Sequence, residues 1–198
     1  MSGRPTSLGS GLWHSLHVKI LMVCTGNLCR SPMAEALMRA ALSAHRCHGF
    51  EITSAGTWAG SGSPATSEAV AAVKARAGDL SSHRSTPLTR EALAEADLVV
   101  AMTSVHVREV LELLPAARRK LVLLNEVLEM YPEVDDRADA RRRLETLLAS
   151  PRPQWRRDLD VDDPIGLGSR AYDRCATVIE EGVRRLASLL CPPSQRAD

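Results

Sequence analysis

The sequence predicts an α/β fold in a single domain, with a four-stranded parallel sheet flanked by helices on both faces. Short apolar segments rich in β-branched residues alternate along the chain with amphipathic segments of helical period. The chain has 198 residues and is 44% hydrophobic, which is enough for one ordinary core. The first apolar segment also leads directly into a short polar loop and a helix start, a layout typical of ligand-binding α/β domains.

Each predicted element follows from this alternation. The expected strands are residues 18–23, 50–53, 98–102 and 121–124. The expected helices are residues 33–45, 67–76, 89–95, 106–113, 138–149 and 169–190. Because right-handed crossovers join parallel strands, ligands are expected at the carboxyl ends of the strands, where Cys24 follows the first one.

The domain organisation is predicted from composition. Residues 1–15 are polar and rich in glycine and serine, and we expect a flexible tail ahead of a domain over residues 16–192. Residues 125–162 form a long segment that looks like an insertion and contains an arginine-rich helix. Two interpretations of this segment remain open: a solvated surface helix with a linker, or a docking surface for a partner or substrate.

Charge and cysteine content limit the class of protein. A net charge of +1 argues against a general nucleic-acid or membrane binder, and no apolar run approaches the ~20 residues of a membrane span. An odd number of cysteines without a secretory signal indicates a reducing compartment, so we expect a cytoplasmic protein. Cys47, Cys175 and Cys191 lack metal-ligand spacing and are expected to be core or incidental residues. We expect no cofactor and no metal, and a monomer or weak dimer.

The loop after the first strand has the spacing of an anion-binding loop. Five residues separate Cys24 from Arg30, about enough backbone to curl once around a tetrahedral oxyanion. Gly26 permits close approach of the backbone, and Asn27 tolerates a left-handed conformation. Ser31 is a good N-cap for a helix whose N-terminus favours anions. The expected phosphate-binding residues are Thr25, Gly26, Asn27, Leu28, Cys29 and Ser31.

The same loop carries the groups needed for nucleophilic displacement at phosphorus. A helix N-terminus and a nearby guanidinium both stabilise a thiolate at Cys24. Arg30 can bind two phosphoryl oxygens at once, and Ser31 can donate a hydrogen bond to the thiolate as it leaves. These parts predict a phosphocysteine intermediate without a metal. The plainer interpretation is that Cys24 is only a buried cysteine at the end of a strand.

The segment from Cys24 to Glu35 resembles the signature of the low-molecular-weight protein tyrosine phosphatases of the bacterial type. The resemblance covers about residues 17–190 and includes the later blocks 54–57, 81–84, 96–102 and 163–164. It implies hydrolysis of phosphotyrosine in proteins, with a bacterial tyrosine kinase among the candidate substrates. It also implies that Asp163, which precedes Pro164, protonates the leaving phenolate. Asp162 is the alternative acid, and the whole acidic run can also be read as a solvated turn.

The resemblance also implies roles for residues around the loop. Ser54 and His83 match positions whose side chains form hydrogen bonds with that of Asn27 and hold it in place. Cys29 matches a residue that can close a reversible disulfide with Cys24 under peroxide. The alternative is that Cys29 simply packs as a small apolar residue.

Two positions bear on substrate choice. Related protein arginine phosphatases carry a threonine where this chain has Leu28, so Leu28 favours phosphotyrosine. Many family members have aromatic residues after the Asp-Pro pair, whereas this chain has Ile165 and Gly166. Trp58 can supply the aromatic wall instead, or it is a partly exposed loop residue.

Two other functions remain as alternatives. An arsenate reductase shares this loop and fold, but it needs two further redox cysteines near residues 75–90, where this chain has none. A non-catalytic protein could use the loop to bind phosphotyrosine, or the arginine-rich segment to bind a partner. Metal-free hydrolysis of an aryl phosphate separates all three functions.

Overall fold

The fold is a four-stranded parallel sheet between two layers of helices, as predicted. The computed structural model describes residues 17–133, 135, 137–151 and 155–192. The sheet order is β2-β1-β3-β4, and the strands are β1 (Val18–Cys24), β2 (Phe50–Gly56), β3 (Leu98–Ala101) and β4 (Leu121–Leu123). The predicted tail over residues 1–15 lies outside the described residues.

All four predicted strands are confirmed; β1 is one residue longer than expected and β2 is three residues longer. β2 continues through Ser54 to Gly56 because its backbone stays paired with β1 as far as Cys24. The polar Ser54 broke the apolar pattern on which the prediction rested. This extension brings the end of β2 beside the residue that ends β1.

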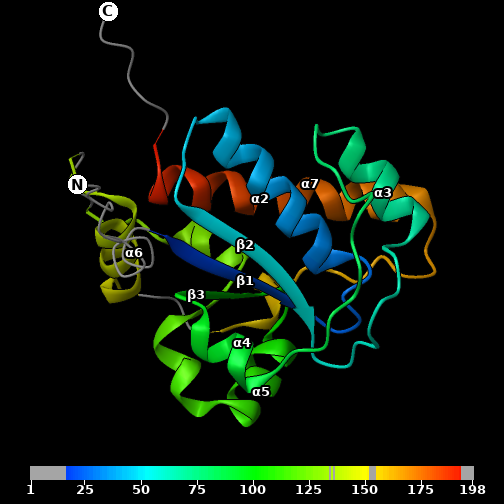
Figure 1. Cartoon of the computed structure of the whole chain (residues 1–198), viewed down its shortest axis with the longest axis horizontal. Helices are drawn as coiled ribbons and strands as arrows, with labels where there is room; N and C mark the ends of the chain where they lie inside the picture. Colours follow the sequence, from blue (N-terminus) through cyan, green and yellow to red (C-terminus); the bar gives the residue numbers. More distant parts are fainter. Residues whose placement is uncertain (1–16, 134, 136, 152–154, 193–198) are drawn as a thin grey trace, which may run out of the picture.

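The helices cover both faces of the sheet (Figure 1). On one side lie α2 (Arg30–Ala44), α3 (Ser67–Lys74) and α7 (Ser169–Leu190), and on the other lie α4 (Arg90–Glu95) and α5 (Ser104–Leu113). The side chains of β1 alternate between the two layers: Ile20 and Met22 join the core under α2 and α7, whereas Leu21 and Val23 join the core under α4 and α5. Short 3-10 turns span Pro115–Lys120, Asn125–Glu129 and Arg157–Leu159.

The arginine-rich segment contains α6 (Ala140–Ala149), which starts two residues later than predicted. Asp139 caps it by accepting a hydrogen bond from the backbone N–H of Arg142 at 2.8 Å. Leu144 and Leu147 are buried in the core shared with α2 and α7. The side chains of Arg142 and Glu145 on its outer face stay exposed, so α6 is a surface helix with one buried face.

α6 lies near the start of β1, whereas Cys24 lies at the other end of this strand (Figure 1). Arg141 donates hydrogen bonds to Asp97 at 3.1 Å and to the carbonyl of His17 at 3.0 Å. At least one arginine of this segment therefore forms an internal contact. The alternative of a docking surface stays a prediction.

The end of α7 is linked covalently to the segment that follows α2. Cys47 and Cys191 form a disulfide across a sequence separation of 144 residues. The prediction that both are core or incidental cysteines is wrong, because the packing of α2 against α7 brings two distant residues together. Cys175 is free and buried in α7, as expected.

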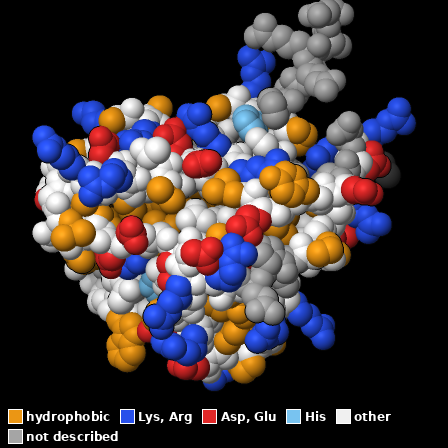
Figure 2. All heavy atoms as spheres, turned by 180° about the vertical axis from the view of Figure 1, so that it is seen from behind, with side chains coloured by type: hydrophobic (Ala, Val, Ile, Leu, Met, Phe, Trp, Pro, Cys, Tyr) orange, Lys and Arg blue, Asp and Glu red, His pale blue; other side chains and the backbone are white. Residues whose placement is uncertain are grey.

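The surface carries charges of both signs. Figure 2 shows basic and acidic side chains interspersed over the back of the molecule, with hydrophobic side chains between them. None of the described helices is long and apolar enough to cross a membrane.

Candidate active site

The anion-binding loop leaves the carboxyl end of the central strand β1. Cys24 ends the strand and is 2% exposed, and α2 begins six residues later at Arg30. The Sγ of Cys24 lies 2.9 Å from the Oγ of Ser31 in the first turn of α2. A hydroxyl in that position can donate to a thiolate.

Asn27 is fully buried and has a left-handed backbone, with φ of 52°. Its Nδ2 donates to the Oγ of Ser31 at 2.9 Å and to the Oγ of Ser54 at 2.8 Å. Its Oδ1 accepts from the backbone N–H of Thr86 at 2.8 Å. The Nε2 of His83 lies 2.8 Å from the backbone oxygen of Asn27, so this histidine contacts the main chain rather than the expected side chain. Together these contacts hold the loop in its curled form.

Gly56 is a site residue that the sequence analysis did not single out. A Cβ at this position would lie 2.9 Å from the backbone nitrogen of Asn27, and closer still to the carbonyl oxygen of Thr25. Only glycine lets the end of β2 approach the loop this closely. The Ser-Ala-Gly-Thr block at residues 54–57 was the available signal.

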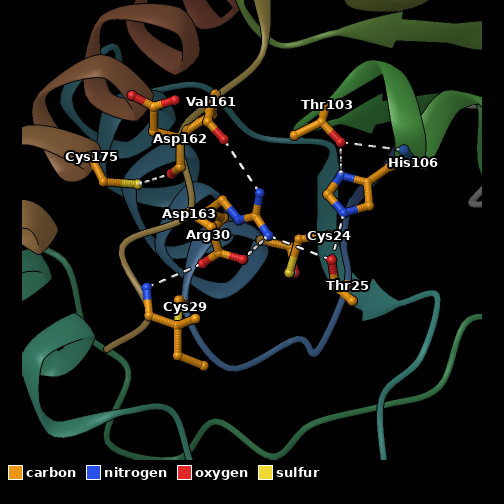
Figure 3. A network of polar contacts seen from close by, with 12 residues as sticks. Cys24, Thr25, Cys29, Arg30, Thr103, His106, Val161, Asp162, Asp163 and Cys175 are labelled. Atoms are coloured by element: carbon orange, nitrogen blue, oxygen red, sulfur yellow. Dashed lines mark hydrogen bonds and ion pairs between the residues drawn. The ribbon is translucent and has the colours of Figure 1, made fainter. Parts of the chain in front are cut away.

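Arg30 is 5% exposed and its guanidinium faces the loop (Figure 3). Nη1 donates to the carbonyl of Val161 at 3.3 Å, and Nη2 contacts the Oγ1 of Thr25 at 3.5 Å. Nη2 also forms an ion pair with the carboxylate of Asp163. The Nε of Arg30 is buried and has no hydrogen-bond partner among the described residues.

The structure separates the two neighbouring aspartates. Asp163 faces Arg30, and its Oδ1 accepts a hydrogen bond from the backbone N–H of Ile165 at 3.2 Å. The carboxylate of Asp162 points away from Arg30 (Figure 3). The backbone oxygen of Asp162 accepts a contact from the Sγ of Cys175 at 3.6 Å. Of the two carboxylates, only that of Asp163 therefore lies at the loop.

Cys29 points into the core between the loop and α7. Its Sγ lies 3.2 Å from the hydroxyl of Tyr172 and 3.9 Å from the Oγ1 of Thr66. Burial raises the pKa of the Cys29 thiol, and it also raises the pKa of Tyr172 to about 12. Cys24 and Cys29 are both free thiols. The predicted disulfide between them stays a prediction.

Two side chains lie at the rim of the loop. Trp58 is 77% exposed, and its indole Nε1 donates to Glu109 at 2.8 Å. The backbone N–H of Trp58 donates to the carbonyl of Thr25 at 2.9 Å. Leu28 is half-buried, and its carbonyl accepts from the backbone N–H of Thr66 at 3.0 Å. Trp58 is thus tied to the loop by its backbone while its ring remains accessible.

His106 is a second site residue that the sequence analysis missed. It lies in the first turn of α5 and is 2% exposed. Its Nε2 is 2.8 Å from the Oγ1 of Thr25, and its Nδ1 is 2.9 Å from the Oγ1 of Thr103. Burial lowers the pKa of His106 to about 4, with a further contribution from the charge of Arg30. The available signal was its place just after β3, whose carboxyl end lies beside that of β1.

Comparisons with known proteins agree with this geometry. The family model described as low molecular weight phosphotyrosine protein phosphatase matches residues 19–143. The probable low molecular weight protein-tyrosine-phosphatase EpsP of Ralstonia solanacearum is 38% identical over 164 residues, which cover 83% of this chain and 90% of that protein. A protein-arginine-phosphatase of Bacillus subtilis (strain 168) is 36% identical over 148 residues, which cover 70% of this chain and 97% of that protein.

Solved structures give the same result. The low molecular weight protein tyrosine phosphatase from T. tengcongensis has a TM-score of 0.67 at 32% identity, covering 85% of this chain and 97% of that one. A YwlE mutant from Bacillus subtilis has a TM-score of 0.68 at 31% identity, covering 86% of this chain and 97% of that one. The similar proteins thus include both tyrosine and arginine phosphatases.

Proposed function

Because the chain belongs to the low molecular weight phosphotyrosine protein phosphatase family, we propose that it hydrolyses phosphotyrosine in proteins through a phosphocysteine at Cys24. The observation that carries this proposal is the convergence of Cys24, Arg30 and Asp163 on one loop. A nucleophile, an oxyanion-binding guanidinium and a carboxyl group then surround the same position. No step requires a metal.

In the first step, the thiolate of Cys24 attacks phosphorus, and a sulfur–phosphorus bond forms as the phosphorus–oxygen bond to the phenol breaks. Asp163 in its acid form gives its proton to the departing phenolate oxygen. In the second step, the carboxylate of Asp163 takes a proton from water as the water attacks the phosphocysteine. Ser31, 2.9 Å from the sulfur, stabilises the thiolate as it leaves.

Arg30 supplies the electrostatic stabilisation. Its buried Nε has no partner among the described residues, and a buried unpaired donor costs about 1–3 kcal/mol. A phosphoryl oxygen in the loop would satisfy this donor. Nε and Nη2 form one edge of the planar guanidinium, so they can hold two oxygens at once as charge grows in the transition state.

The proposed substrate is phosphotyrosine rather than phosphoarginine. Leu28 and Trp58 offer apolar surface at the rim of the loop, and an aryl ring can pack on such surfaces. Ile165, also exposed, adds an aliphatic side chain beside the acid. The ratio of kcat/KM for matched phosphotyrosine and phosphoarginine peptides tests this choice. Leu28→Thr should lower this ratio.

The decisive assay is hydrolysis of an aryl phosphate in buffer with a metal chelator. Cys24→Ser should abolish turnover while inorganic phosphate still binds. Arg30→Lys should also fail, because a point charge does not replace the bidentate fork. Cys175→Ser is the matched thiol control and should keep the parent activity.

The same assay separates the competing functions. Phosphopeptide binding without turnover would identify a non-catalytic binding protein. Arsenate reduction without aryl phosphate turnover would identify a reductase. Cys24→Ser with activity within tenfold of the parent would refute the proposed nucleophile.

The proposal includes a cytoplasmic location, with a tyrosine-phosphorylated protein such as a bacterial tyrosine kinase as substrate. Kinases produce phosphotyrosine where ATP is present. The Cys47–Cys191 disulfide departs from this expectation, because cytosolic thiols are normally kept reduced. Alkylation of thiols in freshly lysed cells tests it, since a cytoplasmic protein should have both cysteines free. Gel filtration tests the expected monomer or weak dimer.

A further inference from the structure

The hydroxyl of Thr25 lies between two donors that come from different helices. Its Oγ1 is 2.8 Å from the Nε2 of His106 on α5 and 3.5 Å from the Nη2 of Arg30 on α2. We propose that His106, as a neutral imidazole, is a positioning residue that fixes the Thr25 hydroxyl as a hydrogen-bond donor to the phosphoryl group. This inference rests on the proposed function, because it assigns a role within the same site.

The contacts of Thr103 determine which nitrogen of His106 carries the proton. The Oγ1 of Thr103 accepts from the backbone N–H of His106 at 3.3 Å and lies 2.9 Å from Nδ1. In the described part of the chain, this buried hydroxyl has no other polar contact, so its single hydrogen goes to Nδ1. Nδ1 is then the acceptor, and Nε2 carries the hydrogen that is donated to Thr25.

The charged groups around His106 come from three segments. Arg30 faces it from α2, Glu109 from α5, and Asp160 and Asp163 from the loop before α7. Burial and the Arg30 charge lower the pKa of His106 to about 4, although the three carboxylates act in the opposite direction. The imidazole is therefore neutral near pH 7 and has a single N–H to donate.

Thr25 then has one arrangement left. Its oxygen accepts from His106 and lies within reach of Arg30, so its own hydrogen must point elsewhere. Figure 3 shows this oxygen on the side of the loop that faces the Arg30 guanidinium and the Cys24 sulfur. A hydroxyl hydrogen there can be donated to a phosphoryl oxygen, which gains charge in the transition state.

The competing explanation is purely structural. Thr103 caps α5 through the backbone of His106, so this pair also stabilises the start of a helix. A structural role predicts loss of stability without a specific link to Thr25. A positioning role predicts that the two residues act as one unit in catalysis.

The test is a double-mutant cycle on aryl phosphate hydrolysis. His106→Ala and Thr25→Val should each lower kcat/KM by about 10- to 100-fold, the range for a hydrogen bond to a charged group. The double variant should be no worse than Thr25→Val alone. His106→Gln should restore most of the activity, because its amide N–H₂ can donate in place of Nε2. Losses that multiply in the double variant, or no recovery with glutamine in a folded protein, would overturn the inference.

Val110→Ala is the structural control, because Val110 is fully buried on α5 and belongs to the core under that helix. It should lower the melting temperature and leave kcat/KM within about twofold. A loss of activity in Val110→Ala as large as the loss in His106→Ala would mean that any weakening of α5 disturbs the site.

Binding of inorganic phosphate separates this inference from the proposed function. In a Cys24→Ser background, His106→Ala and Thr25→Val should weaken phosphate binding to a similar extent. If the parent shows no turnover but both substitutions weaken phosphate binding to a similar extent, the proposed function fails and the positioning role stands. If the parent is active and His106→Ala keeps its kcat/KM, the positioning role fails alone.

Discussion

Arg30, the first residue of α2, donates from Nη2 to the carboxylate of Asp163, which lies 133 residues later in the sequence. The contact joins the loop that would bind the phosphoryl group to the loop that would supply the proton. A phosphoryl oxygen and Asp163 would compete for the same nitrogen of Arg30. Occupancy of the loop is therefore expected to release the carboxyl group toward the leaving oxygen.

The general acid is the first prediction. Asp163→Asn should slow the hydrolysis of phosphotyrosine or phenyl phosphate by about 10²–10⁴-fold, the usual contribution of general acid catalysis. An activated nitrophenyl ester should be affected far less, because its good leaving group departs without a proton. The measurement is the dependence of kcat/KM on the pKa of the leaving phenol, because kcat/KM reports the first step and not the hydrolysis of the phosphocysteine, in which Asp163 acts again.

Asp162→Asn is the matched control, because its carboxylate points away from Arg30. This variant should cost little and leave the leaving-group dependence unchanged. If the rate depends steeply on the leaving group in Asp162→Asn but not in Asp163→Asn, the general acid is Asp162. No steep dependence in either variant would mean that the proton comes from elsewhere.

Redox protection of Cys24 is the second prediction. Peroxide should inactivate the enzyme, and a thiol reductant should restore it, if Cys29 closes a disulfide with Cys24. Closure requires the Cys29 sulfur to leave the hydroxyl of Tyr172, 3.2 Å away. Cys29→Ala should lose activity permanently at the same peroxide dose. Equal recovery of this variant and the parent would rule out the protective disulfide.

The Cys47–Cys191 disulfide gives the third prediction. A crosslink over 144 residues limits the unfolded chain, and such bonds typically stabilise proteins by about 2–4 kcal/mol. A reductant should therefore lower the free energy of unfolding of the parent, measured with urea. Cys47→Ala should be less stable than the oxidised parent and indifferent to the reductant. Alkylation of both cysteines in the purified, air-oxidised folded parent would contradict the bond.

His106 gives the fourth prediction, on the pH dependence of stability. Its pKa falls from 6.5 to about 4 on folding, so below pH 6.5 the unfolded chain binds more protons than the folded one. Stability should therefore decline as the pH falls from 6.5 toward 4, and this histidine should account for roughly 2 kcal/mol between pH 7.5 and 5. Above about pH 7.5 its contribution should not change, because the histidine is then neutral in both the folded and the unfolded chain.

His106→Gln removes this titration and provides the comparison. Urea unfolding at pH 7.5 and pH 5 measures the free energy of unfolding of both proteins. Between pH 7.5 and pH 5 the parent should lose more stability than the variant. Other titrating groups act in both proteins and cancel in the difference between them. A difference that is independent of pH would mean that His106 titrates normally.

Local sequence was sufficient for the sheet and for the loop. Strand and helix periods differ, so the alternation of apolar segments predicted all four strands. The loop could be predicted because its requirements are local: a left-handed residue at Asn27 and a helix that starts at the end of the loop. Both depend on neighbours in the chain, and both are present in the structure. The prediction of Ser31 as the N-cap is wrong, because α2 already begins at Arg30 and the Ser31 hydroxyl contacts Cys24 and Asn27 instead.

Only the tertiary structure decided the contacts between distant residues. Asp162 and Asp163 lie in an irregular loop without a period, so periodicity could not say which carboxylate faces Arg30, and only the Asp-Pro resemblance favoured Asp163. The disulfide depends on how α2 packs against α7, and the contact of His106 with Thr25 depends on how β3 lies beside β1. Local backbone preferences act over a few residues, whereas these contacts arise from the packing of the whole sheet and its helices.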